Sequence, residues 1–400
     1  MSWLTGIKMV NQKKTNHKVL CINQFFPHYR QSVITQLIEK SEHHYDFMGG
    51  KHSFGMGIQL ATNIPADRFK VARGFVFWRF LFWPRPVLAA LNPRYDVLIL
   101  LGNPRIGSMW LTALFGKLTG KRVLFWTHGW KCKEAGFKRF CKNTFFKLAD
   151  GLLLYGHRAK VIGVEEGFNP DHLYVVYNSL DCKAQDKVRS KILSEDRAEM
   201  REELFGEQNM NPVIINITRL HQYKKIDMLI EAAVELKKKS VFVNLLILGD
   251  GPHRGELEEL AERNGIHAVF TGAIYDENKI GRMLDASDLA VMPGPVGLLV
   301  MHALAYGVPV VSNNNFDTQM PEFEAITPGI TGDFFEPDNL NSLVDSIQRV
   351  LNNPMPKEQQ YQKARERIER FYNPVSQRMR IDSAVEGNAA NDLMKTFPYF

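Results

Sequence analysis

Two basic side chains follow a short apolar run in the second half of the chain. The run is Val213–Ile217, and Arg219 and Lys224 come after it, ahead of an amphipathic stretch that begins at Ile226. Ligands of doubly wound sheets bind at the carboxyl ends of the strands, where a guanidinium and an ammonium group can hold phosphate. The pair therefore indicates a phosphate site. A solvated turn with ordinary basic residues is the alternative.

Glycines follow the neighbouring apolar runs in the same half. Gly249 and Gly251 come directly after Leu245–Leu248, and Gly272 ends the next run. Without a Cβ, glycine lets a ligand approach the backbone closely. The spacing is not that of a dinucleotide-binding loop, because Arg254 stands where a third glycine is needed. These glycines are candidates for the lining of the phosphate site.

The segment from Met292 to Val311 combines an apolar run, a Gly/Pro turn and a short helical pattern. The helix is expected to begin near Gly297 and to end at Gly307. The first amides of a helix lack partners within it, and the helix dipole adds positive potential there. The amides near Gly297 and Leu298 can therefore bind a pyrophosphate together with the two cations. A packing turn whose glycines serve only the chain geometry is the alternative.

These residues need a sheet to position them, and short apolar runs alternate with amphipathic stretches, as expected for parallel strands with crossover helices. We expect strands at Lys18–Asn23, Val97–Leu101, Val123–Thr127, Leu152–Tyr155, Tyr174–Tyr177, Val213–Ile217, Leu245–Leu248, Val269–Thr271, Leu289–Met292 and Val308–Ser312, and helices at Gln31–Lys40, Ile106–Leu118 and Phe137–Ala149. The pattern predicts an α/β fold with two doubly wound, Rossmann-like domains that face each other across a cleft. The expected division is a first domain at 1–180, a linker with a short helix at 181–210, a second domain at 211–371, and a tail at 372–400 that crosses back to the first domain.

Charge is divided unevenly between the two halves. Residues 1–180 hold 25 Lys and Arg against 10 Asp and Glu, whereas the remainder holds 25 against 33. The first half therefore predicts an anionic partner. Across 400 residues, 45% are hydrophobic and 23% are charged, which excludes long disorder and collagen-like repeats. The four cysteines lack metal-binding spacing and no apolar run is long enough to span a membrane, so we expect a cytoplasmic protein.

As a set, these motifs resemble the retaining glycosyltransferases of family 4, which have the GT-B fold. The order and spacing that match are those of Arg219-Leu220, Lys224, Gly249–Pro252, Phe270–Gly272, Ala286–Asp288, Gly297-Leu298 and Ala303–Val311. The resemblance implies that Arg219 and Lys224 bind the donor pyrophosphate and that His128 contacts the transferred sugar, with a structural histidine as the alternative for His128. It places Gly249, Gly251, Gly272, Gly297, Leu298 and His302 on the donor side, and His28 and Arg30 on the acceptor side.

The chain departs from this family at two acidic positions. The family carries two glutamates eight positions apart, and the corresponding residues here are Gly294 and His302. A histidine one turn into a helix should stay neutral, because the positive end of the dipole disfavours imidazolium, and a neutral ring can still hydrogen-bond a hydroxyl. His302 is therefore the candidate for contacting the ribose. Gly294 has no side chain with which to contact the donor sugar.

The resemblance predicts transfer of a hexose-type sugar from a nucleotide-sugar to a glycan or lipid-linked glycan acceptor, with retention, in polysaccharide or glycoconjugate biosynthesis. No Asp-x-Asp pair occurs in the sequence, so neither a bridging metal ion nor another cofactor is expected. The missing carboxylates leave a noncatalytic nucleotide-sugar or glycan-binding protein as the alternative. Nucleic-acid binding would explain only the basic half, and without a recognisable motif no nucleic-acid partner is expected.

Residues Arg73–Pro86 interleave aromatic side chains with arginines. Such a mixture suits peripheral contact with an anionic membrane, in which case a lipid-linked acceptor would meet the basic half at the inner face of the cell membrane. An aromatic segment that faces the protein core is an equal alternative.

Overall fold

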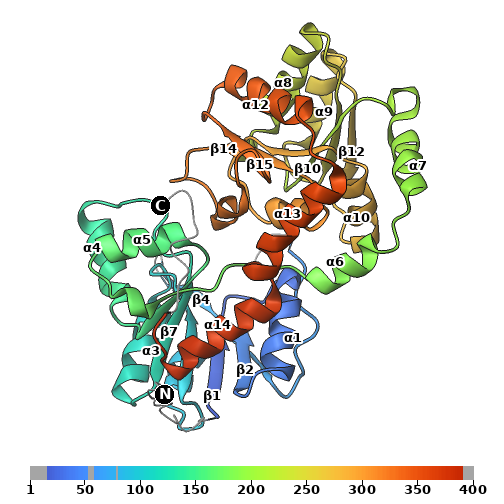
Figure 1. Ribbon diagram of the computed structural model, residues 1–400. Helices are drawn as coiled ribbons and strands as arrows, with labels where there is room; N and C mark the ends of the chain where they lie inside the picture. The colour runs from blue at the N-terminus through green and yellow to red at the C-terminus, as the bar shows by residue number, and fades with distance from the viewer. Residues whose placement is uncertain (1–15, 53–57, 78–79, 391–400) are drawn as a thin grey trace, which may run out of the picture.

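The computed structural model describes residues 16–52, 58–77 and 80–390, and these residues contain two parallel sheets (Figure 1). The first sheet has seven strands in the order β3-β2-β1-β6-β7-β8-β9. Their bounds are β1 Lys18–Ile22, β2 His44–Gly49, β3 Phe69–Val71, β6 Val97–Leu101, β7 Arg122–Thr127, β8 Gly151–Leu154 and β9 Leu173–Val175. Alternate side chains of the central strands point to opposite faces, so both faces of the sheet need a covering layer of helices.

Helices cover both faces of this first sheet. One face packs against α2 (Pro84–Ala90), α3 (Gly107–Leu118), α4 (Gly136–Phe146) and α5 (His157–Glu165). The other face packs against α1 (Gln31–Glu39) and against α14 (Pro374–Glu386), which comes from the far end of the chain. Strands β4 (Phe75–Phe77) and β5 (Phe80–Phe82) form a separate antiparallel pair.

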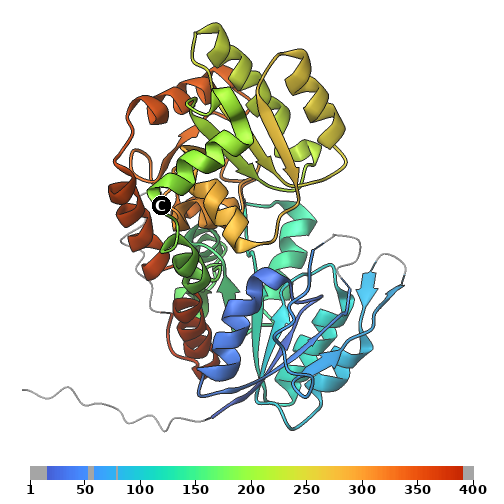
Figure 2. The same ribbon diagram turned by 90° about the vertical axis from the view of Figure 1, so that its right-hand side faces the viewer.

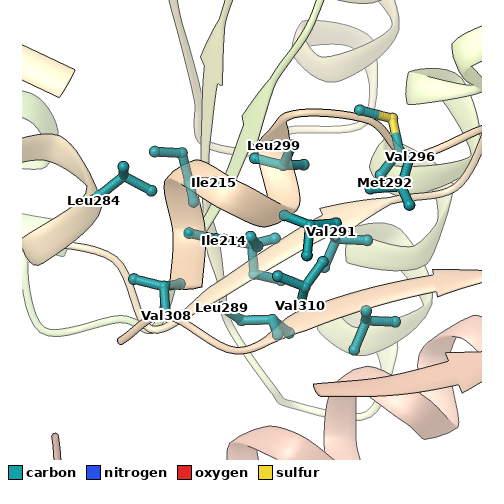
Figure 3. Close-up of a cluster of buried hydrophobic side chains, with 14 of the residues drawn as sticks. Ile214, Ile215, Leu284, Leu289, Val291, Met292, Val296, Leu299, Val308 and Val310 are labelled. Atoms are coloured by element: carbon teal, nitrogen blue, oxygen red, sulfur yellow. The ribbon is translucent and has the colours of Figure 1, made fainter. Parts of the chain in front are cut away.

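The second sheet has six strands in the order β12-β11-β10-β13-β14-β15. Their bounds are β10 Val213–Ile217, β11 Asn244–Leu248, β12 Ala268–Gly272, β13 Leu289–Met292, β14 Val310–Asn313 and β15 Gly332–Phe335. The flanking helices are α8 Ile226–Lys238, α9 Arg254–Arg263, α10 Glu277–Asp285, α11 Leu299–Ala305 and α12 Leu340–Asn352. Figure 3 shows part of the core, in which Ile214 and Ile215 of β10 lie near Leu289 and Val291 of β13 and Leu299 of α11. Complete burial of each such side chain contributes about 1.5–3 kcal/mol.

Four further helices connect the domains or lie between them: α6 Cys182–Arg189, α7 Ser194–Phe205, α13 Lys357–Arg370 and α14. Helices α6 and α7 occupy most of the segment 181–210, for which the sequence suggested a linker with a short helix. Figures 1 and 2 show α14 leaving the second domain and lying along the first. Its Asp382 accepts a hydrogen bond from the hydroxyl of Tyr45 at 2.7 Å, so the last described helix is part of the first domain's packing.

The predicted α/β class with two Rossmann-like domains is confirmed. The sequence prediction missed β2, β3 and β15, and the strand expected from Val308 begins at Val310. Of the aromatic segment, Trp78 and Arg79 lie outside the described residues. Trp83 is only 2% exposed, so the core-facing alternative is correct for this side chain.

Candidate active site in the interdomain cleft

Arg219 and Lys224 lie in the loop between β10 and α8. Leu220 is completely buried and anchors this loop, and the amide of Thr218 donates to the carbonyl oxygen of Leu248 at 2.9 Å. The loop turns into α8 through Lys225, whose φ of 54° is left-handed. The carboxyl end of β10 therefore presents both cations at the edge of the sheet where ligands of doubly wound folds bind.

Lys224 is the more enclosed of the two cations. Its Nζ donates to the carbonyl oxygen of Pro295 at 2.7 Å. Burial lowers the pKa of Lys224 to about 8, the positive charge of Lys131 acts in the same direction, and the carboxylate of Glu322 opposes both. Lys224 is therefore mainly charged at neutral pH and loses its charge under moderately alkaline conditions.

Gly249 and Gly251 pack against the loop that carries Arg219. Gly249 has a φ of 145°, and a Cβ there would overlap the carbonyl oxygen of Thr218. A Cβ at Gly251 would overlap the carbonyl of Leu220, whose amide donates to the carbonyl oxygen of Asp250 at 3.0 Å. These glycines thus let two loops pack closely and fix the position of Arg219. Both also line the cleft described below.

Helix α11 is shorter than the sequence suggested and places His302 differently. The helix begins at Leu299, whereas the prediction was near Gly297, and His302 lies in its last turn. His302 is the fourth of the seven residues Leu299–Ala305 and lies equally far from both ends, so the helix dipole does not decide its charge. The ring is neutral for another reason. Burial and the neighbouring His28 lower the pKa of His302 to about 4.

The Nδ1 atom of His302 is buried and has no hydrogen-bond partner among the described residues. Because a neutral imidazole can accept or donate at this atom, we expect His302→Ala to weaken nucleotide binding by up to about tenfold while bond cleavage slows less. Calorimetric affinity and kcat, measured on the same protein, separate the two effects. His172→Ala, on the surface of the first domain, is the matched control, and an unchanged nucleotide affinity in His302→Ala would refute the ribose contact.

The first domain contributes an aromatic and basic cluster. Arg30 ends the 3-10 helix η1 (His28–Arg30); its guanidinium carbon lies 4.7 Å from the ring centroid of Trp126, and Nη2 donates to the hydroxyl of Tyr155. The ring of His128 lies 4.7 Å from that of Tyr155. Although His128 is accessible to solvent, the surrounding protein desolvates its ring, and with the positive charges of Lys131 and Arg30 this lowers the pKa of His128 to about 4. His128 is thus neutral at pH 7.

A cleft of about 940 Å³ lies between the two domains. It brings together eight of the residues singled out in the sequence: His28, Arg219, Lys224, Gly249, Gly251, Gly297, Leu298 and His302. Arg30, His128 and Gly272 are not part of its lining. Gly272 lies behind Gly249, whose amide donates to the Gly272 carbonyl oxygen at 2.8 Å. The cleft also contains Tyr275, Asp181 and Glu277, which sequence reasoning missed although each stands in a loop or at a helix start.

Glu322 is a further residue that the sequence analysis missed. It lies in the 3-10 helix η5 (Pro321–Ala325), is 4% exposed, and accepts a hydrogen bond from Asn178 at 3.0 Å. Burial raises the pKa of Glu322, whereas Asn178 and the charges of Lys131 and Lys224 lower it. Its position in the segment after β14 was the available signal, since that segment also follows the carboxyl end of a strand.

The domains also meet where a carboxylate of the second caps a helix of the first. Glu324, 1% exposed, accepts hydrogen bonds from the amides of His157 at 2.7 Å and Arg158 at 2.8 Å, at the start of α5. A Cβ at Gly156, which precedes α5, would lie 2.6 Å from an oxygen of Glu324. Because that distance is too short for a real contact, glycine at position 156 makes room for the carboxylate.

This contact predicts a pH-dependent stability. Burial raises the pKa of Glu324 from 4.5 to about 7, even though the two amides favour the ionised form. A carboxyl group with a raised folded-state pKa contributes stability below its unfolded pKa and loses that contribution as the pH rises through the folded value. We expect the unfolding free energy of the wild type, relative to Glu324→Gln, to fall by about 3 kcal/mol between about pH 4 and pH 8. Urea unfolding of both proteins measures this difference, and a pH-independent difference would contradict the assignment.

Comparison with known proteins shows what the second domain is similar to. A family model described as glycosyl transferases group 1 matches residues 196–367. This part of the chain is similar to group 1 glycosyltransferase domains, and the match covers less than half of the 400 residues. The match contains Arg219, Lys224 and His302, and it ends within α13.

Individual relatives of the group 1 domain are distant. An alpha-D-kanosaminyltransferase of Streptomyces kanamyceticus is 26% identical over 186 residues, which are 45% of this chain and 46% of that protein. A GDP-mannose-dependent alpha-(1-6)-phosphatidylinositol monomannoside mannosyltransferase of Mycolicibacterium smegmatis is 29% identical over 171 residues, 40% of this chain and 43% of the relative. The chain thus spans less than half the length of these relatives.

Solved structures share the fold over most of the chain. HepE of Anabaena, in complex with UDP and glucose, superposes with a TM-score of 0.66 at 15% identity and covers 93% of this chain and 100% of its own. A glycosyltransferase from Rickettsia africae superposes with a TM-score of 0.72 at 16% identity and covers 93% of this chain and 98% of its own. The likeness includes the first domain, beyond the group 1 match, and the two-domain GT-B fold is therefore confirmed.

Proposed function

We propose that this protein transfers a hexose-type sugar from a nucleotide-sugar donor to a hydroxyl group of a glycan or lipid-linked glycan acceptor, with retention, in polysaccharide or glycoconjugate biosynthesis. The observation that carries the proposal is the position of Arg219 and Lys224. Both line the interdomain cleft at the carboxyl end of β10, within the group 1 match. The complex of HepE with UDP and glucose supports a nucleotide-sugar donor, and the resemblance to family 4 supports retention.

The chemistry that these residues can perform is charge stabilisation. When the bond between the sugar and the diphosphate breaks, negative charge develops on the leaving phosphate, and cations fixed in advance lower the barrier. Arg219 and Lys224 carry this role in the proposal, which needs no metal ion or other cofactor. His302, neutral at pH 7, contacts the ribose, and the amides of Gly297 and Leu298 contact the diphosphate.

The first domain handles the acceptor in this proposal. His28 lines the cleft opposite His302, and its imidazole lies 5.6 Å from the ring of Tyr275, so aromatic and imidazole groups of both domains lie close together there. His128 contacts the transferred sugar as a neutral hydrogen-bonding group. Because its pKa is lowered to about 4, little of the ring is imidazolium at pH 7, and the proposal assigns it no role as a general acid. Arg30 holds the aromatic groups beside His128 in place.

A donor panel tests the proposal. The purified protein is incubated with UDP-, GDP- and ADP-sugars, with and without oligosaccharide acceptors, and nucleotide release is followed. We expect release from one donor class, and NMR of the product should show the anomeric configuration of the donor. Inverted configuration would overturn retention, and the absence of calorimetric binding of every donor would overturn the site.

A noncatalytic nucleotide-sugar or glycan-binding protein is the second candidate, and one observation favours it. A Cβ at Gly294 would lie 2.5 Å from the carbonyl oxygen of Tyr223, so no side chain fits where the resembling family has its first glutamate. Donor binding in the calorimeter without release from any donor would establish this second function in place of the first.

A further inference from the structure

The first half of α4 exposes two phenylalanine rings. Phe137 is 80% exposed, Phe140 is 65% exposed, and their ring centroids lie 6.4 Å apart. The second half of the same helix packs normally, since Phe145 and Phe146 are buried against the first sheet. Residues at i and i+3 share one side of a helix, so the two exposed rings form a single apolar projection. The fold does not need these rings, and contiguous exposed apolar groups mark interaction sites.

The surroundings of these rings are strongly basic. Residues 131–147 hold six Lys and Arg and a single acidic residue, Glu134. Glu165, which ends α5, pairs with Lys133 at 3.0 Å, and the next residue, Glu166, pairs with Arg139 at 2.6 Å. Glu134 pairs with Lys138 at 3.1 Å and with Lys142 at 3.2 Å. Lys131 does not belong to this surface, because its Nζ lies 3.2 Å from the sulfur of Met320 in the second domain. The other five cations still outnumber the three glutamates and leave a positive excess. The surface therefore complements an anionic partner.

The neighbouring helix also exposes apolar side chains. The ring of Trp110 in α3 lies 4.9 Å from that of Phe145 in α4, which places the two helices side by side. Leu111, Leu114 and Leu118 follow a helical spacing along α3 and are 39%, 44% and 73% exposed. Figure 1 shows α3 and α4 on the side of the first domain that lies away from α1. We call α4, residues 132–135 and the exposed leucines of α3 the α3–α4 face.

We propose that the α3–α4 face docks the protein on an anionic lipid bilayer. Aromatic rings that insert among the headgroups and lysines that meet anionic lipids are the two components of interfacial binding. Among the described residues, no helix is both long and apolar enough to cross a bilayer. The loop before α4 begins at His128, which the proposed function places beside the transferred sugar, so docking holds the first domain against the bilayer. That the bilayer supplies a lipid-linked acceptor rests on the proposed function, whereas the docking itself does not.

Vesicle co-sedimentation tests the docking. Vesicles of phosphatidylcholine alone are compared with vesicles in which a third of the lipid is phosphatidylglycerol. We expect binding to the anionic vesicles that weakens with added salt. Phe137→Ser/Phe140→Ser should lower the partition coefficient about tenfold or more, and each of Lys133→Ala, Lys138→Ala and Lys147→Ala about fivefold. The matched controls are Phe242→Ser and Lys238→Ala, which alter exposed residues of the second domain and should bind as the wild type does.

Three results would overturn the proposal. They are equal binding to both kinds of vesicle, equal loss of binding in the controls, and undiminished binding of the Phe137→Ser/Phe140→Ser protein. A dimer in light scattering that this double variant dissolves, without any vesicle binding, would assign the face to a second copy of the chain. The vesicle assay contains no nucleotide-sugar, so its result does not depend on the outcome of the donor panel. Nucleotide release in solution should be unchanged in the double variant.

Discussion

Arg219→Ala and Lys224→Met should each lower the rate of nucleotide release by about 10²–10³, the effect of removing one fixed donor from a developing oxyanion. Arg219 approaches the cleft from the loop after β10, and Lys224 is held against the carbonyl oxygen of Pro295. Methionine keeps most of the volume of the lysine side chain, so Lys224→Met removes the charge with little change in packing. The measurement is kcat for release from the donor that the panel identifies.

The pH dependence separates the charge of Lys224 from its shape. Because burial lowers the pKa of Lys224 to about 8, release by the wild type should fall as the pH rises through that value. A guanidinium does not lose its proton in this range, so Lys224→Arg should abolish this alkaline decline. Lys238→Ala, on the exposed surface of α8, is the control and should behave as the wild type at every pH. Undiminished turnover in both Arg219→Ala and Lys224→Met would remove the assigned site.

The α/β fold of the second domain could be predicted because its central strands have a simple sequence pattern. Val213–Ile217 and Leu289–Met292 are short, mainly apolar runs that are buried almost throughout. Polar residues follow the first run, and a Gly/Pro turn follows the second. Parallel strands that are covered on both faces require such runs. Ligands of these sheets bind at the edge where the strands end, so cations that bind phosphate are expected there. This is why the sequence indicated Arg219 and Lys224 as candidates, and the structure places both in the lining of the cleft.

Strand β2 shows why other elements could not be predicted. Its sequence, His44–Gly49, contains Asp46, which is completely buried. A charge inside a strand argues against burial unless distant residues satisfy it. The hydroxyl of Tyr95 donates to Asp46 at 2.6 Å, and Arg94 lies 3.2 Å from the same carboxylate oxygen. These partners stand almost 50 positions later in the chain, and the sequence around Asp46 does not indicate that they will contact it.

Some residues near the candidate site could not be predicted from the sequence for a similar reason. Glu322 and Glu324 lie more than 140 positions from Asn178 and Arg158, with which they pair across the domain boundary. Their function depends on how the two domains meet, and the pattern of one chain segment does not contain that information. The prediction for His302 differs from the structure in the position of the helix. His302 lines the cleft, but the helix begins two residues later than expected and places it midway between the two ends of the dipole.

Gly294→Glu, which restores the first glutamate of the resembling family, should destabilise the protein rather than improve donor binding. A Cβ at Gly294 would lie 2.5 Å from the carbonyl oxygen of Tyr223 and 2.7 Å from the Cα of Lys224. These are backbone atoms of the loop that carries the cation, and the amide of Gly294 donates to the carbonyl oxygen of Lys224 at 3.0 Å. Relief of the clash therefore requires the Lys224 loop to move.

We expect Gly294→Glu to lower the free energy of unfolding by about 3 kcal/mol or more, the upper range for overpacking, and to abolish nucleotide release. Gly294→Ala should lose nearly as much, since the clash begins at Cβ. Gly297→Ala, where a Cβ would meet no atom within 4 Å, should unfold at the wild-type denaturant concentration. Denaturant unfolding of the three variants measures these effects. A stable Gly294→Glu protein with faster release would mean that the Lys224 loop can move aside and that the site still accepts a glutamate. An unfolded Gly294→Glu protein would mean that the backbone of the Lys224 loop fills the space that a glutamate side chain would need.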